Sequence, residues 1–374
     1  MLNRLFFIFY YFFVSFIYVF SLPFLLILPF VKSKFRQSLP ARFFLCNNKF
    51  KSCDLWVHAC SLGEVTAIKP FIEGKDVFIT TITKTGQDAA KKLSAKTGYL
   101  PYEMLLPFWV KRANTLVILE AEFWLMMVVV AKLKGMKVVL LNTRISEKSY
   151  PKYLRFAFFY KIFFKYVDII YAQSKEDKTR LKSLGAKDIQ VVGNIKTIAK
   201  IKTTKTYTKS NQEVITIASS HKDEEKLILD SLDIGNRKII VVPRHPERFI
   251  EVSEYLAKFS KNRNLSFSKF SETENFDSDV VLVDVLGELV NIYAITDITI
   301  LCGSFVDGIG GHNPLEPATF NNKIISGKYI FNQKSLYPSV ENILITQLDN
   351  INDTISKAIH TYIKKIANKS DISI

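Results

Sequence analysis

The longest apolar stretch of the chain lies at its start. Leu5 to Val31 contains no charged residue and is dominated by phenylalanine, tyrosine, leucine and isoleucine. Roughly 20 apolar residues are enough to cross a bilayer as a helix. Pro23 and Pro29 would kink or end that helix, so an embedded anchor that does not cross is also open. The run exceeds the roughly 7–15 residues of a signal-peptide core, and no small-x-small cleavage site follows. We predict a membrane anchor over residues 1–35.

Beyond the anchor, short apolar runs alternate with helical stretches in two series. The first series predicts strands at residues 55–59, 76–81, 115–119, 137–141, 168–172 and 190–192. After a Lys/Thr-rich segment, 197–211, which indicates a linker, the second predicts strands at 214–218, 238–242, 280–283 and 298–301. Such alternation is typical of parallel, doubly wound sheets. We expect an α/β protein with two Rossmann-like domains, 36–196 and 197–350, facing across a cleft. The faint pattern of 351–374 fits a helix that returns to the first domain.

Polar residues follow many of these strands, where parallel sheets bind their ligands. In the first series they are Glu64, Glu120, Glu122, Asn142 and Arg144. In the second they are Ser219, Ser220, His221, Arg244, His245, Gly287 and Glu288. Four of the five histidines, His58, His221, His245 and His312, lie in such segments, whereas His360 does not. Because histidine titrates near neutral pH, we expect at least two of the four in a ligand site.

The most informative segment is a glycine-rich loop after the strand at 298–301. Gly303, Gly308, Gly310 and Gly311 precede Asn313-Pro314-Leu315-Glu316, which predicts a helix start with Asn313 as N-cap. Glycine allows close approach, and free N–H groups at a helix start bind phosphate. Glu316, one turn further, suits a pair of ribose hydroxyls. A glycine-rich surface loop is the alternative, but the His, Asn and Glu residues favour a nucleotide site.

Composition narrows the choice of partners. The chain has 51 lysines and arginines against 35 aspartates and glutamates, a net charge of +16. Nucleic-acid binding would need basic residues on one face or a known module, and neither is evident. We expect no nucleic-acid partner and favour anionic lipid. Lys32, Lys34, Arg36 and Arg42 follow the anchor, against Arg4 before it, so the positive-inside rule places the remainder in the cytoplasm.

The four cysteines, Cys46, Cys53, Cys60 and Cys302, form no CxxC pair. Their spacing supports neither a disulfide framework nor a zinc site, and it suits a reducing compartment.

Nine motifs together resemble the 3-deoxy-D-manno-octulosonic acid (Kdo) transferases of lipopolysaccharide synthesis. They are WVHACSLGE (56–64), TTITKTG (80–86), LEAEFW (119–124), NTRISEKS (142–149), VVGNIK (191–196), ASSHKDEE (218–225), VPRHPERF (242–249), DVLGEL (284–289) and CGSFVDGIGGHNPLEP (302–317). They follow the family's order over about residues 56–335. A single such motif would be weak, whereas nine in order are specific.

The resemblance implies a GT-B glycosyltransferase that inverts the anomeric configuration of its donor. It implies CMP-Kdo as donor, bound mainly by the C-terminal domain, with no metal in the nucleotide site and no cofactor. The acceptor would be the lipid A precursor (lipid IVA), offered to the N-terminal domain at the cytoplasmic face of the inner membrane.

The resemblance also implies roles for single residues. Glu64, the glutamate of the family's SxGE motif, would take the proton of the acceptor hydroxyl, and Glu120 would orient the acceptor or the Kdo sugar. Ser61, Gly63 and Arg144 would lie on the acceptor side. The donor side would comprise Ser219, Ser220, His221, Arg244, His245, Gly287, Glu288, Gly310, Gly311, His312, Asn313 and Glu316. Within that set, Arg244 and His245 would meet the CMP phosphate, Gly287 and Glu288 would border the cytosine, and Glu316 would take the ribose hydroxyls.

Several roles stay open at this point. Glu64 also fits a charge complement at a helix start, Glu122 a strand-end cap, and Arg248 a structural ion-pair partner. Lys196 would touch the donor carboxylate or remain a solvated linker residue, and Arg144 would meet a lipid A phosphate or brace Glu120.

The chain departs from the family's pattern at four places, which are Phe123-Trp124-Leu125-Met126 for the usual Leu-Trp-Pro-Asn, Ser220 for threonine, Cys302 for glycine and Glu103 for aspartate. None of these removes a proposed catalytic group.

Three other functions are alternatives to this one: a GT-B enzyme with a UDP-sugar donor, a nucleotide-sugar epimerase, and a basic protein without catalysis that binds membrane or nucleic acid.

Overall fold

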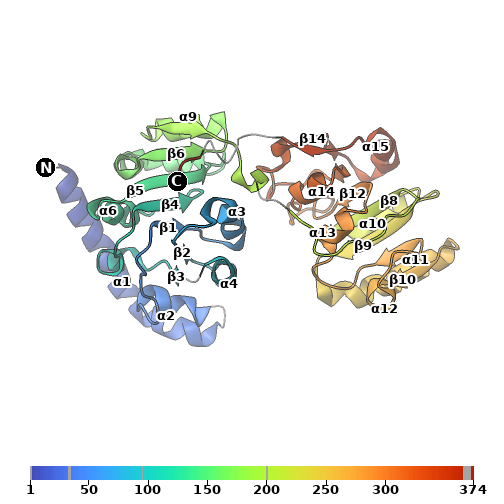
Figure 1. Ribbon diagram of the computed structural model, residues 1–374, viewed down its shortest axis with the longest axis horizontal. Helices are drawn as coiled ribbons and strands as arrows, with labels where there is room; N and C mark the ends of the chain where they lie inside the picture. The colour runs from blue at the N-terminus through green and yellow to red at the C-terminus, as the bar shows by residue number, and fades with distance from the viewer. Residues whose placement is uncertain (1, 33–34, 95, 199–200, 365–371) are drawn as a thin grey trace. The chain divides into compact units, whose positions relative to one another are not determined.

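The computed structural model describes residues 2–32, 35–94, 96–198, 201–364 and 372–374, with the backbone alone for residues 2–5. The chain divides into two compact units (Figure 1). Unit 1 comprises Met1–Ala199 and Ile366–Ile374, and unit 2 comprises Lys200–Lys365.

Unit 1 is built on a seven-stranded parallel sheet of order β3-β2-β1-β4-β5-β6-β7. The strands are β1 Leu55–His58, β2 Val77–Thr81, β3 Lys96–Tyr99, β4 Thr115–Leu119, β5 Lys137–Thr143, β6 Ile169–Ala172 and β7 Ile189–Val191. Its helices are α1 Leu2–Val31, α2 Ser38–Phe43, α3 Leu62–Ile72, α4 Lys84–Leu93, α5 Leu106–Trp109, α6 Leu125–Leu133, α7 Tyr150–Arg155, α8 Ala157–Phe163 and α9 Lys175–Ser183. Short 3₁₀ turns occur at η2 Glu103–Leu105, η3 Phe164–Tyr166 and η4 Ile195–Ile198.

The alternation of side chains along each strand produces two cores, one on each face of the sheet. Trp56 and Phe78 enter a core completed by α5, α6, α8 and α9, whereas Val57 and Ile79 enter one completed by α3 and α4. Because helices cover both faces, the central strands are apolar at consecutive positions. Because of this burial, the central strands can be predicted from the sequence as short runs of apolar residues.

Unit 2 repeats the same plan with a parallel sheet of order β10-β11-β9-β8-β12-β13-β15. The strands are β8 Val214–Ser220, β9 Lys238–Pro243, β10 Phe267–Lys269, β11 Val280–Leu282, β12 Ile298–Leu301, β13 Lys323–Ser326 and β15 Leu344–Ile345, and β14 Val340–Glu341 pairs with β16 Tyr362–Ile363. The helices are α10 Glu224–Ser231, α11 Phe249–Asn262, α12 Phe270–Thr273, α13 Leu289–Tyr293, α14 Leu315–Thr319 and α15 Ile351–Lys357, with 3₁₀ turns η5 Pro246–Arg248, η6 Tyr337–Ser339 and η7 Leu348–Asn350.

Two parallel α/β units therefore confirm the fold class expected from the sequence. In each sheet the strand order reverses beside the first strand of the unit, between β1 and β4 and between β8 and β12. Ligands of open α/β sheets bind at the carboxyl ends of strands at this reversal.

The anchor forms one helix, α1, which continues past Pro23 and ends two residues beyond Pro29. The prolines therefore do not end it, contrary to one expectation. Residues Phe6–Val31 have a mean hydropathy of 2.3 and are long enough to cross a membrane.

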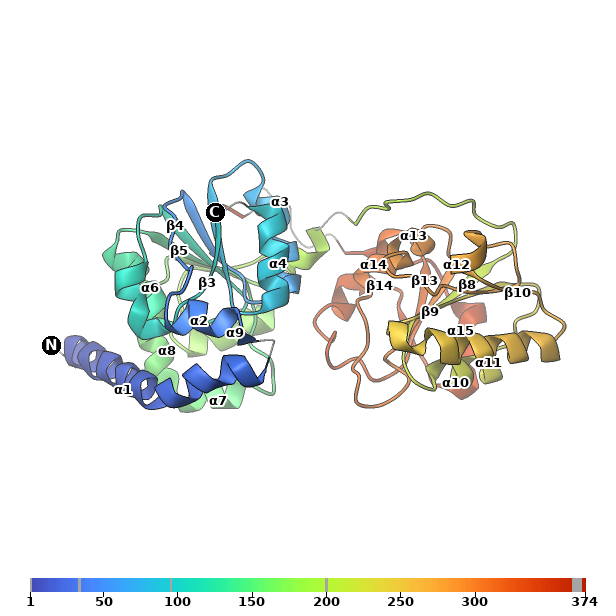
Figure 2. The same cartoon turned by 90° about the horizontal axis from the view of Figure 1, so that it is seen from below.

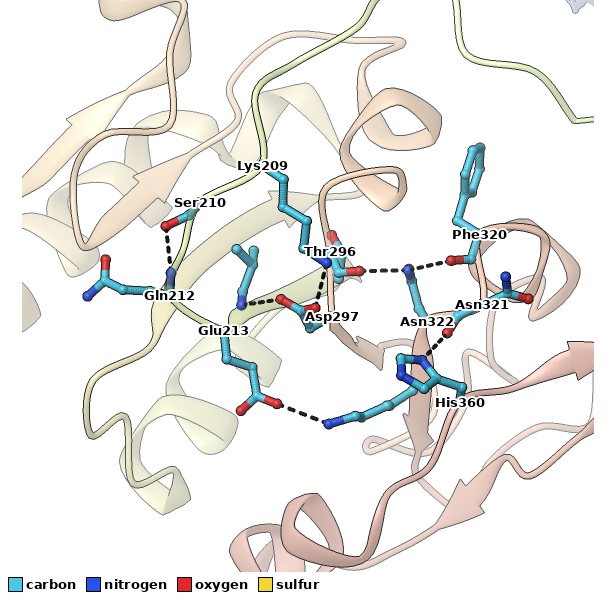
Figure 3. A network of polar contacts seen from close by, with 12 residues as sticks. Lys209, Ser210, Gln212, Glu213, Thr296, Asp297, Phe320, Asn321, Asn322 and His360 are labelled. Carbon is cyan, nitrogen blue, oxygen red and sulfur yellow. Dashed lines mark hydrogen bonds and ion pairs between the residues drawn. The ribbon is translucent and has the colours of Figure 1, made fainter.

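The Lys/Thr-rich segment is not a free linker along its whole length. Asn291 Oδ1 accepts the N–H groups of Thr204 and Lys205, and Tyr207 donates to Glu288. Further on, Lys209 pairs with Asp297, whose other oxygen accepts the N–H of Val214 at the start of β8 (Figure 3). From Thr204 onward the segment is thus fastened to unit 2.

The C-terminal range 351–374 was expected to be a returning helix. Its described part forms α15 and β16 within unit 2, and residues 365–371 lie outside the described residues. At the extreme end, Ile372 is buried in the α3/α4-side core of unit 1, and the N–H of Ser373 donates to the Tyr171 hydroxyl at 3.0 Å.

Candidate active site

The backbone itself marks the strand ends of both units. Glu120, Asn142 and Ser219, directly after or at the ends of β4, β5 and β8, adopt left-handed φ values of 56°, 60° and 56°. Strand register shifts at Asn142 and at Ser219. Non-glycine residues rarely adopt this conformation, and they gather at functional sites where the surrounding structure enforces it. These three are among eleven described non-glycine residues with positive φ, and they lie at the strand ends where the sheet topology favours a ligand site.

Glu64 is the central acidic residue of unit 1. It stands in the first turn of α3, and Ser61 precedes that helix as N-cap. Its carboxylate accepts the N–H of Cys60 at 2.8 Å and the hydroxyl of Ser61 at 2.7 Å. Only 7% of the residue is exposed. Burial raises the pKa of Glu64 to about 7, the Ser61 and Cys60 hydrogen bonds oppose that rise, and Glu120 and Glu122 add to it. Near neutral pH, Glu64 can therefore both take up and release a proton.

Glu120 and Glu122, which follow β4, act electrostatically on Glu64. We refer to Glu64, Glu120 and Glu122 together as the acidic edge of unit 1. Lys196 Nζ lies 2.9 Å from Glu120 Oε1, so Lys196 is an ion-pair partner and not a solvated linker residue. Glu122 accepts the indole N–H of Trp124 at 2.8 Å. Among the described residues, Lys196 thus pairs with Glu120 and forms no ion pair with Glu64.

Arg42 is a member of this edge that sequence analysis missed. Its Nε donates to the carbonyl of Leu100 at 2.9 Å, and it interacts electrostatically with Cys60 and Glu122. In the sequence it is one of several basic residues after the anchor, so only tertiary structure shows its position.

The other acceptor-side residues are placed as follows. A Cβ on Gly63 would meet no atom within 4 Å, so the turn above Glu64 is open. Arg144, just after β5, is half-buried. Within the part of the chain that the structure describes, Arg144 has no hydrogen-bond or ion-pair partner, so it does not brace Glu120 through a direct contact.

His58 is a core residue of unit 1. It is fully buried, and its Nδ1 lies 3.1 Å from the Thr80 hydroxyl. Burial lowers the pKa of His58 to about 3, with a further contribution from Arg42. His58 is therefore neutral and inaccessible, which corrects the interpretation of strand-end position as a sign of ligand contact. His360 bonds the carbonyl of Asn321, which precedes β13, at the opposite end of the sheet of unit 2 (Figure 3).

The remaining three histidines come together in unit 2. His221 Nε2 and His312 Nε2 are 2.9 Å apart, and their rings stack with centroids 5.1 Å apart. The His245 ring lies edge-on to His221, also at 5.1 Å. Burial lowers the pKa of His312 to about 4, and His221, Arg244 and His245 lower it further. Burial and the neighbouring cations also lower the pKa of His221. Both shifts favour the neutral imidazole forms, in which one Nε2 can donate its N–H to the other.

Arg244 and Glu316 flank the histidines. Arg244 is exposed and, among the described residues, forms no ion pair, although its charge acts on His221, His312 and Glu316. Burial raises the pKa of Glu316, while a hydrogen bond from Asn313 and the charge of Arg244 oppose this. Asn313 Oδ1 also accepts the N–H of Leu315 at 3.0 Å, but α14 begins one residue later than the sequence predicts, with Pro314 and not Asn313 as its N-cap. A guanidinium without an ion-pair partner among the described residues is suited to an anionic ligand.

The glycine loop is closed by a hydrogen bond from Gly311 N–H to Gly303 O at 2.7 Å. Gly303, Gly310 and Gly311 have φ values of 70°, 91° and 79°. A Cβ on Gly303 would lie 2.9 Å from the His312 ring, so glycine is required for His312 to reach His221.

Two buried glutamates hold the loops that carry these groups. Glu224 accepts the N–H groups of His221, Gly303 and Phe305 at 3.0, 2.8 and 3.1 Å. It thereby ties the loop after β8 to the loop after β12. Glu225 accepts two bonds from Arg248 and one from the Ser220 hydroxyl. Arg248 is thus a structural ion-pair partner, one of the two roles left open, and the Ser220 hydroxyl is fully buried and already engaged.

The remaining predicted donor residues are also partly engaged. Glu288 is bound by Lys205, Tyr207 and Asn291 at 2.6, 2.7 and 2.8 Å, so its carboxylate fastens the connecting segment. Gly287 has open space around it, and Ser219 is buried in its bulge. Within the described residues, no group of three or more His, Cys, Asp or Glu side chains is arranged to hold a metal ion.

Comparison with known proteins identifies the family. A family model described as 3-deoxy-D-manno-octulosonic-acid transferase (kdotransferase) matches residues 37–199. The 3-deoxy-D-manno-octulosonic acid transferase of Chlamydophila psittaci is 30% identical over 366 residues, which cover 87% of this chain and 81% of the relative. The chain belongs to the Kdo transferase family. The motif resemblance is thereby confirmed, and this Kdo transferase family member is a glycosyltransferase of lipopolysaccharide synthesis.

Two further similarities define how far this assignment reaches. A bifunctional glycosyltransferase/methyltransferase of Fusobacterium nucleatum is 31% identical and covers 89% of this chain, but the chain spans only 56% of that relative's length. The crystal structure of the UDP-GlcNAc 2-epimerase of Neisseria meningitidis bound to UDP-GlcNAc covers 81% of this chain and 90% of its own, with a TM-score of 0.52 and 11% identity. This last similarity shows that the chain shares a fold with the epimerase, and nothing about its reaction.

Proposed function

We propose that this chain transfers Kdo from CMP-Kdo to a lipid A precursor, with inversion at the anomeric carbon. The observation that carries the proposal is Glu64, a buried carboxylate whose pKa is raised to about 7 at the strand-order reversal of unit 1. A transfer to a hydroxyl needs one base of this kind.

In the proposed step, an acceptor hydroxyl oxygen attacks the anomeric carbon of Kdo as its bond to the CMP phosphate breaks. The hydroxyl proton passes to Glu64, and CMP leaves with the bonding electron pair. Ser61 and the N–H of Cys60 fix the position of the Glu64 carboxylate. Glu120, held by Lys196, orients the acceptor or the sugar.

Unit 2 would bind the donor. Arg244, His245 and the His221–His312 pair provide cation and N–H donors for the phosphate that leaves as CMP. Gly310 and Gly311 provide a loop backbone that a phosphate can approach, and Glu316 would take the ribose hydroxyls. Because these groups can meet the phosphate charge, the proposal includes no metal ion and no resident cofactor.

The acceptor is a lipid, and the proposal places the chain at the cytoplasmic face of the inner membrane. The apolar helix α1 and the basic residues after it support this location. Arg144, which is half-buried and makes no ion pair within the described residues, would meet a phosphate of the lipid A precursor.

The test is a transfer assay on the full chain in mild detergent. Lipid A precursor and CMP-Kdo generated in place are supplied with EDTA, and the lipid is analysed by mass spectrometry and its new linkage by NMR. A gain of Kdo mass with inverted configuration supports donor, acceptor, stereochemistry and metal independence together. Turnover of UDP-sugars alone would overturn the donor assignment.

A further inference from the structure

The anchor helix α1 is fastened to unit 1 along one face. Tyr10 donates to Glu103 at 2.8 Å, Tyr11 donates to the carbonyl of Met104 at 2.9 Å, and Tyr18 donates to the carbonyl of Phe43. Glu103 is a buried carboxylate that also accepts the N–H of Met126. Withdrawing Tyr10 would therefore remove a partner from a buried acid, which is costly.

Aromatic packing extends this attachment toward the N-terminal end of the helix. Phe6 meets Phe158 of α8 with centroids 6.3 Å apart, and Phe7 meets Tyr166 at 5.6 Å. Further along, Tyr18 stacks on Tyr102 at 5.7 Å. Contacts with unit 1 thus run from Phe6 to Tyr18, about 18 Å along a helix axis.

The remaining part of the helix is too short to cross a bilayer. Residues 19–31 extend about 20 Å as a helix, whereas the hydrocarbon core is about 30 Å thick. The chain also turns back after α1, because Phe43 of α2 stacks on Tyr18 at 6.3 Å. A crossing helix would have its two ends on opposite sides of the membrane, but Phe6 near one end and α2 beyond the other both lie against unit 1 (Figure 2).

The opposite face of α1 is an apolar stripe with no protein cover among the described residues. Phe9, Phe16, Phe20 and Phe24 are between 69% and 72% exposed, and their spacing places them on one side of the helix. Beside the stripe, Phe7, Tyr11 and Phe12 form with Val129 and Leu133 of α6 an apolar depression of about 300 Å³.

Charge around this surface favours a lipid over other occupants. Lys152, Arg155, Lys161 and Lys165, on or beside α7 and α8, are exposed and form no ion pair with any residue that the structure describes. Helix α8 adjoins α1 through the contact of Phe158 with Phe6. Exposed cations next to an apolar stripe match the anionic headgroups and acyl chains of one membrane leaflet.

We infer that α1 lies in the plane of the membrane, with its stripe embedded among the acyl chains of a single leaflet, and does not cross. The occupant of the stripe and of the depression beside it is phospholipid. Unit 1 is thereby held with α1 and α6 against the bilayer, and α6 is the helix that follows Glu120 and Glu122.

The test is a depth measurement by spin labelling on the full chain. In a Cys46→Ser background, which removes the exposed native thiol, labels are placed at Phe9→Cys, Phe20→Cys and Phe30→Cys. The protein is bound to vesicles of phosphatidylethanolamine containing phosphatidylglycerol. An in-plane helix places all three labels at a similar depth, within about 10 Å below the phosphates. A crossing helix would bring the Phe20 label to about 15 Å and the other two near opposite surfaces, which would overturn the inference.

Two controls test for non-specific depth and for coverage of the stripe by a second copy of the chain. Lys91→Cys, an exposed position on α4, which covers the face of the unit 1 sheet opposite to α6, should show no depth. A second copy covering the stripe would produce spin–spin broadening without depth, and would overturn the proposal. Each labelled variant is first shown to transfer Kdo to detergent-dispersed acceptor, so that misfolding is recognised. Because that assay needs no bilayer, failure of the orientation and failure of the proposed reaction are distinguishable.

Discussion

At the residue scale, Glu64 has two roles that share the same contacts. Its bonds to Cys60 N–H and the Ser61 hydroxyl resemble those of a helix capping box, which would make it structural. A cap, however, works best as a solvated, fully charged carboxylate, whereas burial raises the pKa of Glu64 to about 7. The charge therefore destabilises the fold at neutral pH, as expected for a group kept for its chemistry.

Glu64→Gln separates the two roles. We expect transfer to fall by about 10²–10⁴-fold, because the base is lost while the shape of the side chain is retained. In the native protein the rate should fall as pH drops below about 7, where Glu64 becomes protonated. Between the unfolded pKa and about 7 the folded state binds more protons, so Glu64 lowers stability as pH rises. At pH 8 the Gln variant should therefore be more stable, by on the order of 2–3 kcal/mol.

Rate profiles and denaturant unfolding across pH measure both effects. Ser61→Ala is the matched control: it removes a bond that lowers the pKa of Glu64, so the acid limb of the rate profile should move to higher pH. Wild-type turnover by Glu64→Gln would sink the assignment, and destabilisation at pH 8 would mean that the capping role dominates.

Arg244 and Arg248 provide a second pair with opposite expectations. Arg244→Ala should weaken CMP binding by about 10–150-fold, as for loss of a charged hydrogen bond, with little change in stability because Arg244 is exposed. Arg248→Ala leaves the buried Glu225 without its ion-pair partner, so it should destabilise the fold by about 3 kcal/mol or more. Calorimetric titration measures the CMP affinity of both variants, and thermal unfolding measures their stability. Equal CMP affinity in native protein and Arg244→Ala would refute the phosphate role.

Sequence alone located these residues but not the direction of their side chains. Post-strand position correctly brought His221, His245 and His312 together, yet His58 has the same kind of position and is buried. Ser220 is occupied by Glu225, a partner close in sequence. Glu288 is bound to Lys205, which only the tertiary fold brings near. Strand ends are visible as local patterns, whereas side-chain partners depend on long-range contacts.

At the element scale, the loop after β12 depends on one glycine for its shape. Gly303 has φ 70°, and a Cβ there would lie 2.9 Å from His312 and 3.0 Å from Ile309. Gly303→Ala should therefore displace His312 from His221, weaken CMP binding more than tenfold, and cost stability through both strain and overpacking, about 2–4 kcal/mol in sum.

Gly235→Ala is the matched control for this substitution. Gly235 also has a positive φ, of 53°, but its Cβ would meet only Arg237 at 3.7 Å. The control should cost about 1 kcal/mol from strain and leave CMP affinity unchanged. If both variants bind CMP equally well, the shape of the loop does not govern donor binding.

The elements that sequence analysis missed share a physical cause. Strand β12 was located correctly because a four-residue apolar run ends at a glycine loop. Strand β3 contains Lys96 and Gly98, and its glycine is set by crowding, since a Cβ there would lie 2.7 Å from Asn48. Helix α6 is apolar and buried along most of its length, so it lacks the periodicity that distinguishes a helix from a strand. In both β3 and α6, the secondary structure depends on packing in the folded chain and not on a local sequence pattern.

At the scale of the whole molecule, the chain comprises two compact units. Among the residues that the structure describes, each apolar cluster lies within one unit, and the cluster that contains Ile372 lies in unit 1. Separate cores favour separate cooperative transitions. The proposed base, Glu64, belongs to unit 1, whereas the groups proposed to bind CMP-Kdo belong to unit 2.

This division predicts an asymmetric response to CMP. In mild detergent, calorimetry should resolve two unfolding transitions, and CMP at about 100 times its Kd should stabilise one of them by about 2.7 kcal/mol. For a unit of this size that corresponds to a rise of about 5–10 °C in Tm. Hydrogen exchange should assign the shifted transition to unit 2, with protection centred on the loops after β8 and β12. Arg244→Ala should reduce the shift, because the affinity that produces it is lower. A shift confined to unit 1 would move the donor site there, and an equal shift of both transitions would mean that nucleotide binding couples the two units.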